Sequence, residues 1–97
     1  MQHIVMLKFD KKQDESTLGP IVSSIYDQLR DEYKVIDSYK YHTNCLDLDP
    51  NMDLVIFVNI PKGQELSKYI KHPRHVDFLN KMKEIGLASK AAIDIEI

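Results

Sequence analysis

The stretch from Tyr69 to Phe78 holds the side chains best suited to chemistry. It reads Tyr-Ile-Lys-His-Pro-Arg-His-Val-Asp-Phe and places His75 in the first turn after Pro73. A helix start favours neutral imidazole, because the partial positive charge there opposes protonation. A neutral histidine beside the apolar positions Phe78 and Leu79 is a usable general base. From periodicity alone, however, a histidine at this place is more often a packing residue hydrogen-bonded to backbone, so both interpretations stay open.

Two other groupings resemble metal sites only in part. The loop at 47–53 carries Asp47, Asp49, Asn51 and Asp53 at every second position, like the opening of a calcium loop. Met52, however, stands where glycine is needed and Val58 where glutamate is needed. His72 and His75 are three residues apart, yet no cysteine or third histidine lies nearby in the sequence. We therefore expect a solvated acidic loop and no metal site.

The elements that must position these residues follow from apolar spacing. Leu18, Ile21, Val22, Ile25 and Leu29 share one helical stripe, which Asp14 or Ser16 can cap. The sequence predicts strands at His3–Phe9, Val35–Thr43, Asp53–Ile60 and Ala91–Ile97, helices at about Glu15–Glu32, Gln64–Ile70 and Pro73–Ile85, and a loop at Asn44–Met52. In the last helix, Val76, Leu79, Met82 and Ile85 form the predicted buried face, and Gly86 ends it.

This order of elements predicts an α+β, ferredoxin-like split βαβ fold with a four-stranded antiparallel sheet. The first strand carries Val5, Leu7 and Phe9 on one side and Ile4 and Met6 on the other. Helices on one face of the sheet would leave the second apolar face wet. We therefore expect two copies to stack these faces as a homodimer.

Composition limits the remaining possibilities. The chain has 97 residues, which suits a single domain over 1–97, and a formal net charge of −2, which gives no support to nucleic-acid binding. The longest apolar run, Leu54–Val58, is too short to span a membrane, and Cys45 is the single cysteine. These features predict a cytoplasmic protein. Residues 62–90 hold seven basic against three acidic side chains, either solvated helix faces or a pocket rim that attracts carboxylates.

Three segments together resemble the stress-responsive A/B barrel domain family: the first strand, the block Tyr69–His75 with its His-Pro-x-His motif, and the closing Ile93-Asp94-Ile95. The resemblance covers essentially the whole chain and implies a dimeric α+β barrel. In the plant polyketide cyclases that resemble this family, a tyrosine and a histidine assist an aldol-type ring closure. The resemblance implies those roles for Tyr69 and His75, with Asp94 orienting His75 and His3 lining the pocket, and it requires no cofactor or metal.

The sequence thus supports more than one function. Our first hypothesis is a dimer whose apolar pocket, lined by His3, Val5, Leu7 and Phe78, binds a small apolar or aromatic acid. The alternative is a cofactor-independent cyclase or isomerase of the polyketide-cyclase type that uses Tyr69 and His75. A cofactor-free monooxygenase and a purely structural stress protein are further alternatives.

Overall fold

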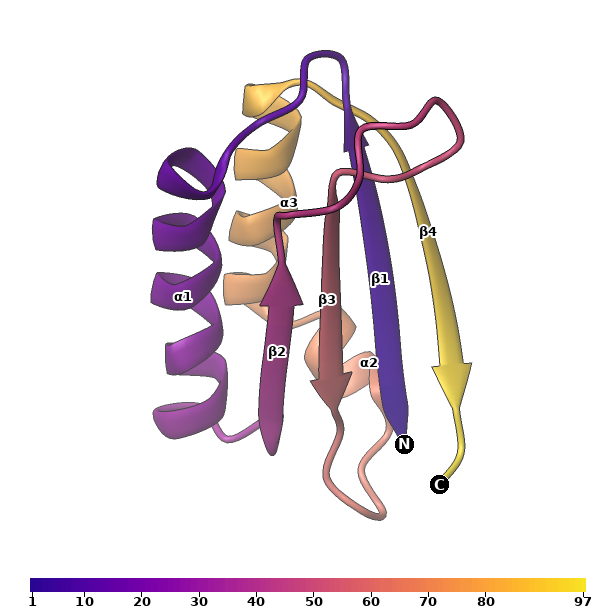
Figure 1. Ribbon diagram of the computed structural model, residues 1–97. Coiled ribbons are helices and arrows are strands. Elements are labelled where there is room, and N and C mark those ends of the chain that lie inside the picture. The colour runs from indigo at the N-terminus through magenta and orange to yellow at the C-terminus, as the bar shows by residue number, and fades with distance from the viewer.

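The computed structural model describes residues 1–97 and shows one antiparallel sheet with its strands in the order β2-β3-β1-β4. All three helices lie on the same side of this sheet (Figure 1). The elements are β1 (Gln2–Phe9), α1 (Glu15–Asp31), β2 (Ser38–His42), β3 (Leu54–Asn59), α2 (Leu66–Ile70), α3 (Pro73–Ile85) and β4 (Leu87–Ile95). The structure confirms the expected α+β, ferredoxin-like fold.

Strand β1 lies at the centre of the sheet and alternates strictly between two environments. Its odd-numbered residues His3, Val5, Leu7 and Phe9 are buried beneath the helices, whereas the even-numbered ones are half-buried. The register places Val5 opposite Ile56 of β3 and Ala92 of β4, so these three side chains face the helices together. The alternation thus decides which side chains of the sheet can meet α2 and α3.

The opposite face of the sheet has no helix over it (Figure 1). We call it the open face; its apolar members are Ile4, Met6, Val55, Phe57, Ile93 and Ile95. Ile93 and Ile95 are among the exposed large apolar side chains, at 54% and 40% exposure. A second apolar face on the sheet, as the sequence predicted, is therefore present.

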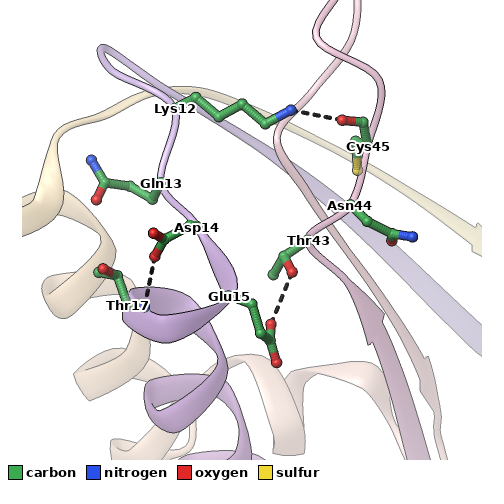
Figure 2. A pocket seen from close by; sticks show the side chains of 8 residues that line it. All are labelled: Lys12, Gln13, Asp14, Glu15, Thr17, Thr43, Asn44 and Cys45. Carbon is green, nitrogen blue, oxygen red and sulfur yellow. Dashed lines mark hydrogen bonds between the residues drawn. The ribbon is translucent and has the colours of Figure 1, made fainter.

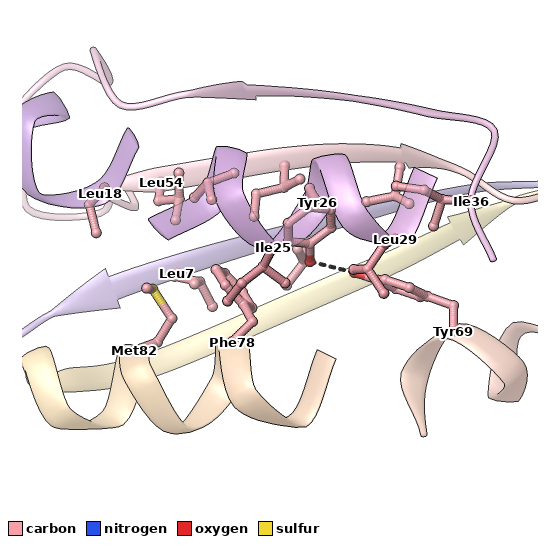
Figure 3. Packing of buried hydrophobic residues seen from close by; sticks show 14 of the residues in the cluster. Leu7, Leu18, Ile25, Tyr26, Leu29, Ile36, Leu54, Tyr69, Phe78 and Met82 are labelled. Atoms are coloured by element: carbon pink, nitrogen blue, oxygen red, sulfur yellow. Dashed lines mark hydrogen bonds between the residues drawn. The ribbon is translucent and has the colours of Figure 1, made fainter. Parts of the chain in front are cut away.

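Helix α1 begins where the sequence predicted and contributes the largest part of the core. Asp14 is the N-cap, and its carboxylate accepts a hydrogen bond from the backbone N–H of Thr17. Of the expected stripe, Leu18, Val22, Ile25 and Leu29 are buried and Ile21 is half-buried, and the buried stripe also includes Tyr26. Figure 3 shows Tyr26 among the apolar side chains that meet α2 and α3 from above.

The junction between α2 and α3 has a clear local cause. Pro73 occupies the first position of α3, where its missing N–H costs nothing. The His72 side chain accepts a hydrogen bond from the backbone N–H of Arg74 and so caps the helix. Gly86 ends α3 in the left-handed conformation, at φ 113°, which favours glycine.

The predicted buried face of α3 was wrong at Val76. This side chain is 45% exposed, whereas Met82 is buried as expected and Leu79 and Ile85 are half-buried. His75 and Phe78 are the further buried residues of this helix. Two stripes lie side by side on this helix, and periodicity alone cannot select between them. The stripe that carries the large ring of Phe78 faces the sheet and α1.

Two strand boundaries were also wrong. Val35 and Ile36 precede β2 as buried residues, and the backbone N–H of Val35 bonds to the Leu29 carbonyl at the end of α1. The backbone N–H of Val35 therefore bonds to the end of α1 rather than to a neighbouring strand. Strand β4 begins at Leu87 rather than Ala91, because it pairs with β1 from the end of α3 onward, across a register shift at Lys8/Phe9.

No helix in the structure is both long and apolar enough to cross a membrane.

Candidate functional site

A cavity of about 220 Å³ lies between the helix-facing side of β1 and β4 and the helices α2 and α3. Six of the nine residues that line it are hydrophobic, among them Val5, Phe78 and Leu79. The polar lining side chains are His3, His75 and Lys90. A small apolar space with a few convergent polar groups is the usual form of a binding site for a small molecule.

His75 reaches this cavity from the first turn of α3 and is only 5% exposed. Burial, together with the nearby charges of His3 and Lys90, lowers its pKa from 6.5 to about 4, so the ring is neutral at physiological pH. Its Nδ1 lies 2.9 Å from the carbonyl oxygen of Ile70. A carbonyl can only accept, so Nδ1 carries the proton and Nε2 keeps a free lone pair.

His3 faces the same cavity from β1 and is also 5% exposed. Its Nδ1 lies 2.6 Å from Oδ1 of Asp94, the residue directly across from it on β4. A carboxylate bonded to one ring nitrogen fixes the orientation of the imidazole. The second nitrogen, Nε2, has no hydrogen-bond partner within the protein.

The placement of Asp94 differs from the one that the resemblance implied. Asp94 was expected to orient His75, but its carboxylate lies on His3, and His75 is held by a backbone carbonyl instead. The reason is the antiparallel register of β1 and β4, which sets His3 opposite Asp94. Side chains directly opposite on one face of a sheet are the ones that interact most closely.

Tyr69 packs beside both histidines but does not line the cavity. Its ring centroid lies 4.6 Å from that of His75 and 5.8 Å from that of His3. Its hydroxyl is hydrogen-bonded to the hydroxyl of Tyr26 at 2.5 Å, as Figure 3 shows. The residue is fully buried, and this burial raises the pKa of its phenol.

The expected pocket residues separate into two groups. Val5 and Phe78 line the cavity, whereas Leu7 is fully buried in the core and does not. Lys90, which lines the cavity from β4, was counted only among the seven basic residues of 62–90, and Tyr26, which holds the Tyr69 hydroxyl, was not predicted. Tyr26 is eight residues after Leu18 on the same helical stripe, a spacing that could have identified it.

The largest cavity, about 570 Å³, lies elsewhere, between the segment that leads into α1 and the start of the loop after β2. Figure 2 shows that several of its polar groups are paired with one another: Lys12 donates to the Cys45 carbonyl and Thr43 to the Glu15 carboxylate. Only one of its eight lining residues is hydrophobic. An open polar groove of this kind has little apolar surface to offer a ligand, so its size does not make it the candidate site.

No three histidine, cysteine, aspartate or glutamate side chains lie close enough together to hold a metal ion. Of the two histidines that were considered as ligands, His72 caps α3 and packs against Tyr33, with ring centroids 4.4 Å apart. Asp53, at the end of the acidic loop, is buried and accepts a hydrogen bond from the backbone N–H of Phe9. His72 and Asp53 therefore have structural roles.

The sheet order, the helices on one face and the cavity beneath them define a ferredoxin-like α+β protein with a small, partly open cavity. The chain matches the model of one family, described as Stress responsive A/B Barrel Domain, over residues 1–97. It belongs to this family. Among curated proteins no match is found.

Solved structures share the fold at low sequence identity. The Arabidopsis thaliana protein At3g17210 is 15% identical, with a TM-score of 0.75 over 99% of this chain and 93% of that one. A dimeric protein of unknown function and ferredoxin-like fold from Bacteroides fragilis is 19% identical, with a TM-score of 0.73 and coverages of 99% and 94%. A hydroxynitrile lyase from Passiflora edulis is 12% identical, with a TM-score of 0.64 and coverages of 99% and 94%. At these identities the likeness concerns the fold alone.

Proposed function

We propose that this protein is a homodimer that binds a small apolar or aromatic acid in the cavity between the sheet and helices α2 and α3. One observation carries the proposal: a partly open, mostly apolar space of about 220 Å³ into which two histidines and one lysine converge. An apolar cavity of roughly 150 Å³ is enough to take up benzene, so this one can hold a substituted ring.

The lining suits an acid better than a neutral hydrocarbon. Lys90 is exposed and lies at the rim, where its ammonium group can meet a carboxylate without being desolvated. Val5, Phe78 and Leu79 offer apolar surface to a ring. A ligand with an apolar end and an anionic end therefore matches the two ends of the site.

Binding of benzoate, followed by isothermal titration calorimetry and by NMR shifts of the histidine rings, tests this proposal. We expect Lys90→Ala to weaken binding at least fivefold and Ala92→Phe, which fills the cavity opposite Val5, to abolish it. Lys83→Ala removes an exposed cation in the last turn of α3, outside the cavity, and is the matched control. Failure of benzoate to bind, or equal binding by all variants, would contradict the proposal.

The homodimer is supported by the open face. Six large apolar side chains lie there without a helix over them, and burying such a face would remove it from water. The Bacteroides fragilis protein of the same fold is itself described as dimeric. We infer that two copies pack these faces together.

Ile93→Lys tests the dimer directly. Ile93 is more than half exposed in the single chain, so a lysine there is compatible with the fold but places a charge in the inferred interface. We expect sedimentation equilibrium to show a dimer for the natural protein and a folded monomer for this variant. Val76→Lys places the same charge on exposed α3 and should remain dimeric. A natural protein that is monomeric at micromolar concentration would refute the interface.

A cyclase or isomerase is the second candidate, and the state of His75 favours it. A neutral imidazole that presents a free Nε2 lone pair to an apolar cavity is placed as a proton acceptor. The resemblance adds Tyr69 as the partner of His75. If the protein is such an enzyme, His75→Ala should remove turnover while the dimer persists; a packing role predicts a loss of stability instead.

A further inference from the structure

The contact between His3 and Asp94 is the part of the cavity wall that the proposed function leaves unexplained. The two residues lie at opposite ends of the chain, and their side chains meet at 2.6 Å on the helix-facing side of the sheet. His3 is 5% exposed, whereas the Asp94 side chain is 42% exposed. The carboxylate thus stays partly hydrated while it holds a buried imidazole.

This contact decides which nitrogen of His3 faces a ligand. Asp94 can only accept, so Nδ1 carries a proton and points to the carboxylate. All fully buried side-chain nitrogen and oxygen atoms of the structure have a hydrogen-bond partner. Nε2 of His3 has no partner, so it is not one of these fully buried atoms. Nε2 is therefore at the cavity surface. A second proton on this ring must sit on Nε2 and point into the cavity.

His75 faces the same cavity, but the acceptor that holds its Nδ1–H differs from that of His3. Its Nδ1–H is held by the Ile70 carbonyl, a neutral acceptor, and its Nε2 likewise has no partner in the protein. A carboxylate partner stabilises positive charge on an imidazole, whereas a buried carbonyl does so far less. The two imidazoles of this cavity thus have different hydrogen-bond acceptors, a carboxylate for His3 and a carbonyl for His75. Different surroundings of two titratable groups are how a site assigns one of them as acid and the other as base.

We propose that the cavity catalyses keto–enol proton transfer in small aromatic 2-oxo acids, with His75 as proton acceptor, His3 as proton donor and Asp94 as the positioning residue of His3. This inference rests on the proposed binding of a small aromatic acid. It assigns to His3 the donor role that the resemblance assigned to Tyr69, whose hydroxyl bonds to Tyr26 in the core. The ligand's carboxylate would meet Lys90, and its ring the apolar wall.

The proton transfer balances without any further reactant. Nε2 of His75 takes a proton from the carbon next to the carbonyl, and the electrons of that C–H bond form the carbon–carbon double bond. The carbonyl π pair moves to oxygen, which takes the proton from Nε2 of His3. The step begins with His75 as neutral imidazole and His3 as imidazolium, with one proton of His3 on Nδ1 toward Asp94 and the other on Nε2. It ends with His75 as imidazolium and His3 as neutral imidazole, and the reverse transfer restores both. The developing negative charge on oxygen is stabilised by the donor that already points at it.

Phenylpyruvate in D₂O is the probe for this reaction. Its benzylic hydrogens exchange for deuterium each time the enol forms, and proton NMR follows the loss of their signal. We expect the natural protein to accelerate this exchange above the buffer rate. His3→Asn and His75→Asn each keep an amide N–H where Nδ1–H was, but remove Nε2, and each should slow exchange at least tenfold.

Asp94→Asn tests the positioning role with a readout that a merely structural contact would not change. The amide keeps its size but loses its charge, so ¹⁵N shifts of His3 should show a mixture of ring tautomers and the exchange should slow at least tenfold. The pH dependence of the exchange rate must be compared between the natural protein and Asp94→Asn, with Lys90, His75 and Tyr69 left unchanged in both. These three side chains also face His3 and would affect its protonation. His72→Asn, which keeps the cap on α3 outside the cavity, is the control and should leave exchange unchanged.

The outcomes separate the two proposals. Phenylpyruvate that shifts the ring signals of both histidines without faster exchange would overturn the catalytic inference and leave the binding proposal intact. A probe that neither binds nor exchanges would overturn both. Exchange that is fast but insensitive to His3→Asn and Asp94→Asn would refute the roles assigned to that pair.

Discussion

The buried, neutral state of His75 predicts a measurable dependence of stability on pH. The perturbation is His75→Asn, whose side-chain amide can still donate to the Ile70 carbonyl but cannot take up a proton. In the folded protein the pKa of His75 is about 4, against 6.5 for a free histidine. The unfolded chain therefore binds a proton between pH 6.5 and pH 4 that the folded chain does not, so the free energy of unfolding falls as the pH drops through this range.

The magnitude follows from the two pKa values. At pH 5 the unfolded state is mostly protonated at His75 and the folded state is not, which corresponds to about 2 kcal/mol relative to pH 7.5. Below pH 4 the difference approaches about 3 kcal/mol, because both states are then protonated. His75 is 5% exposed, so solvent does little to screen this effect.

Urea unfolding at pH 7.5 and pH 5.0, followed by circular dichroism, measures the effect. Protein concentration must be held constant, because dimerisation also contributes to stability. The natural protein should lose about 2 kcal/mol more than His75→Asn between the two pH values. His72→Asn, which removes an imidazole outside the cavity and preserves the helix cap, is the matched control. Parallel losses in the natural protein and His75→Asn would show that His75 is not buried in its neutral form.

Further substitutions test three local features by urea unfolding. Tyr26→Phe and Tyr69→Phe each leave a buried hydroxyl without its partner, so the double variant should cost about 1 kcal/mol less than the sum of the single ones; strict additivity would deny the contact. Asp53→Ala leaves the buried N–H of Phe9 unpaired and should cost about 1–3 kcal/mol, part of which Asp53→Asn restores; no loss would show that water replaces the carboxylate. Gly86→Ala forces a side chain into the left-handed conformation and should cost about 1 kcal/mol or more, whereas unchanged stability would contradict this C-cap.

Most of the fold could be predicted because its signals are local. The alternation in β1, the stripe of α1 and the His72-Pro73 break each lie within a short window of sequence. The errors arose where distant contacts decide. Val35 and Ile36 are residue types typical of a strand, but the backbone N–H of Val35 bonds to the end of α1. Val76 is exposed because a neighbouring stripe of α3 packs against the sheet instead.

The candidate site was less accessible to prediction for a related reason. His3 and His75 stand out by residue type, and the structure places both on one cavity. Which of them Asp94 contacts depends on the register between β1 and β4, and no local pattern contains that register. Lys90 gave no signal of its own, because it is one of many lysines in the second half of the chain.

The pairing of β1 with β4 has a consequence for the order in which the molecule is completed. His3 and Asp94 are separated by 91 positions in the sequence, so their contact closes nearly the whole chain into a loop. Contacts of such separation form late, since the entropy of the intervening chain must be lost before they contribute. Helix α1 and the β1–β3 ladder need far less of the chain. During synthesis on the ribosome, β1 and β3 can therefore pair while the β4 wall of the cavity is still missing, and the cavity is complete only once β4 has been made.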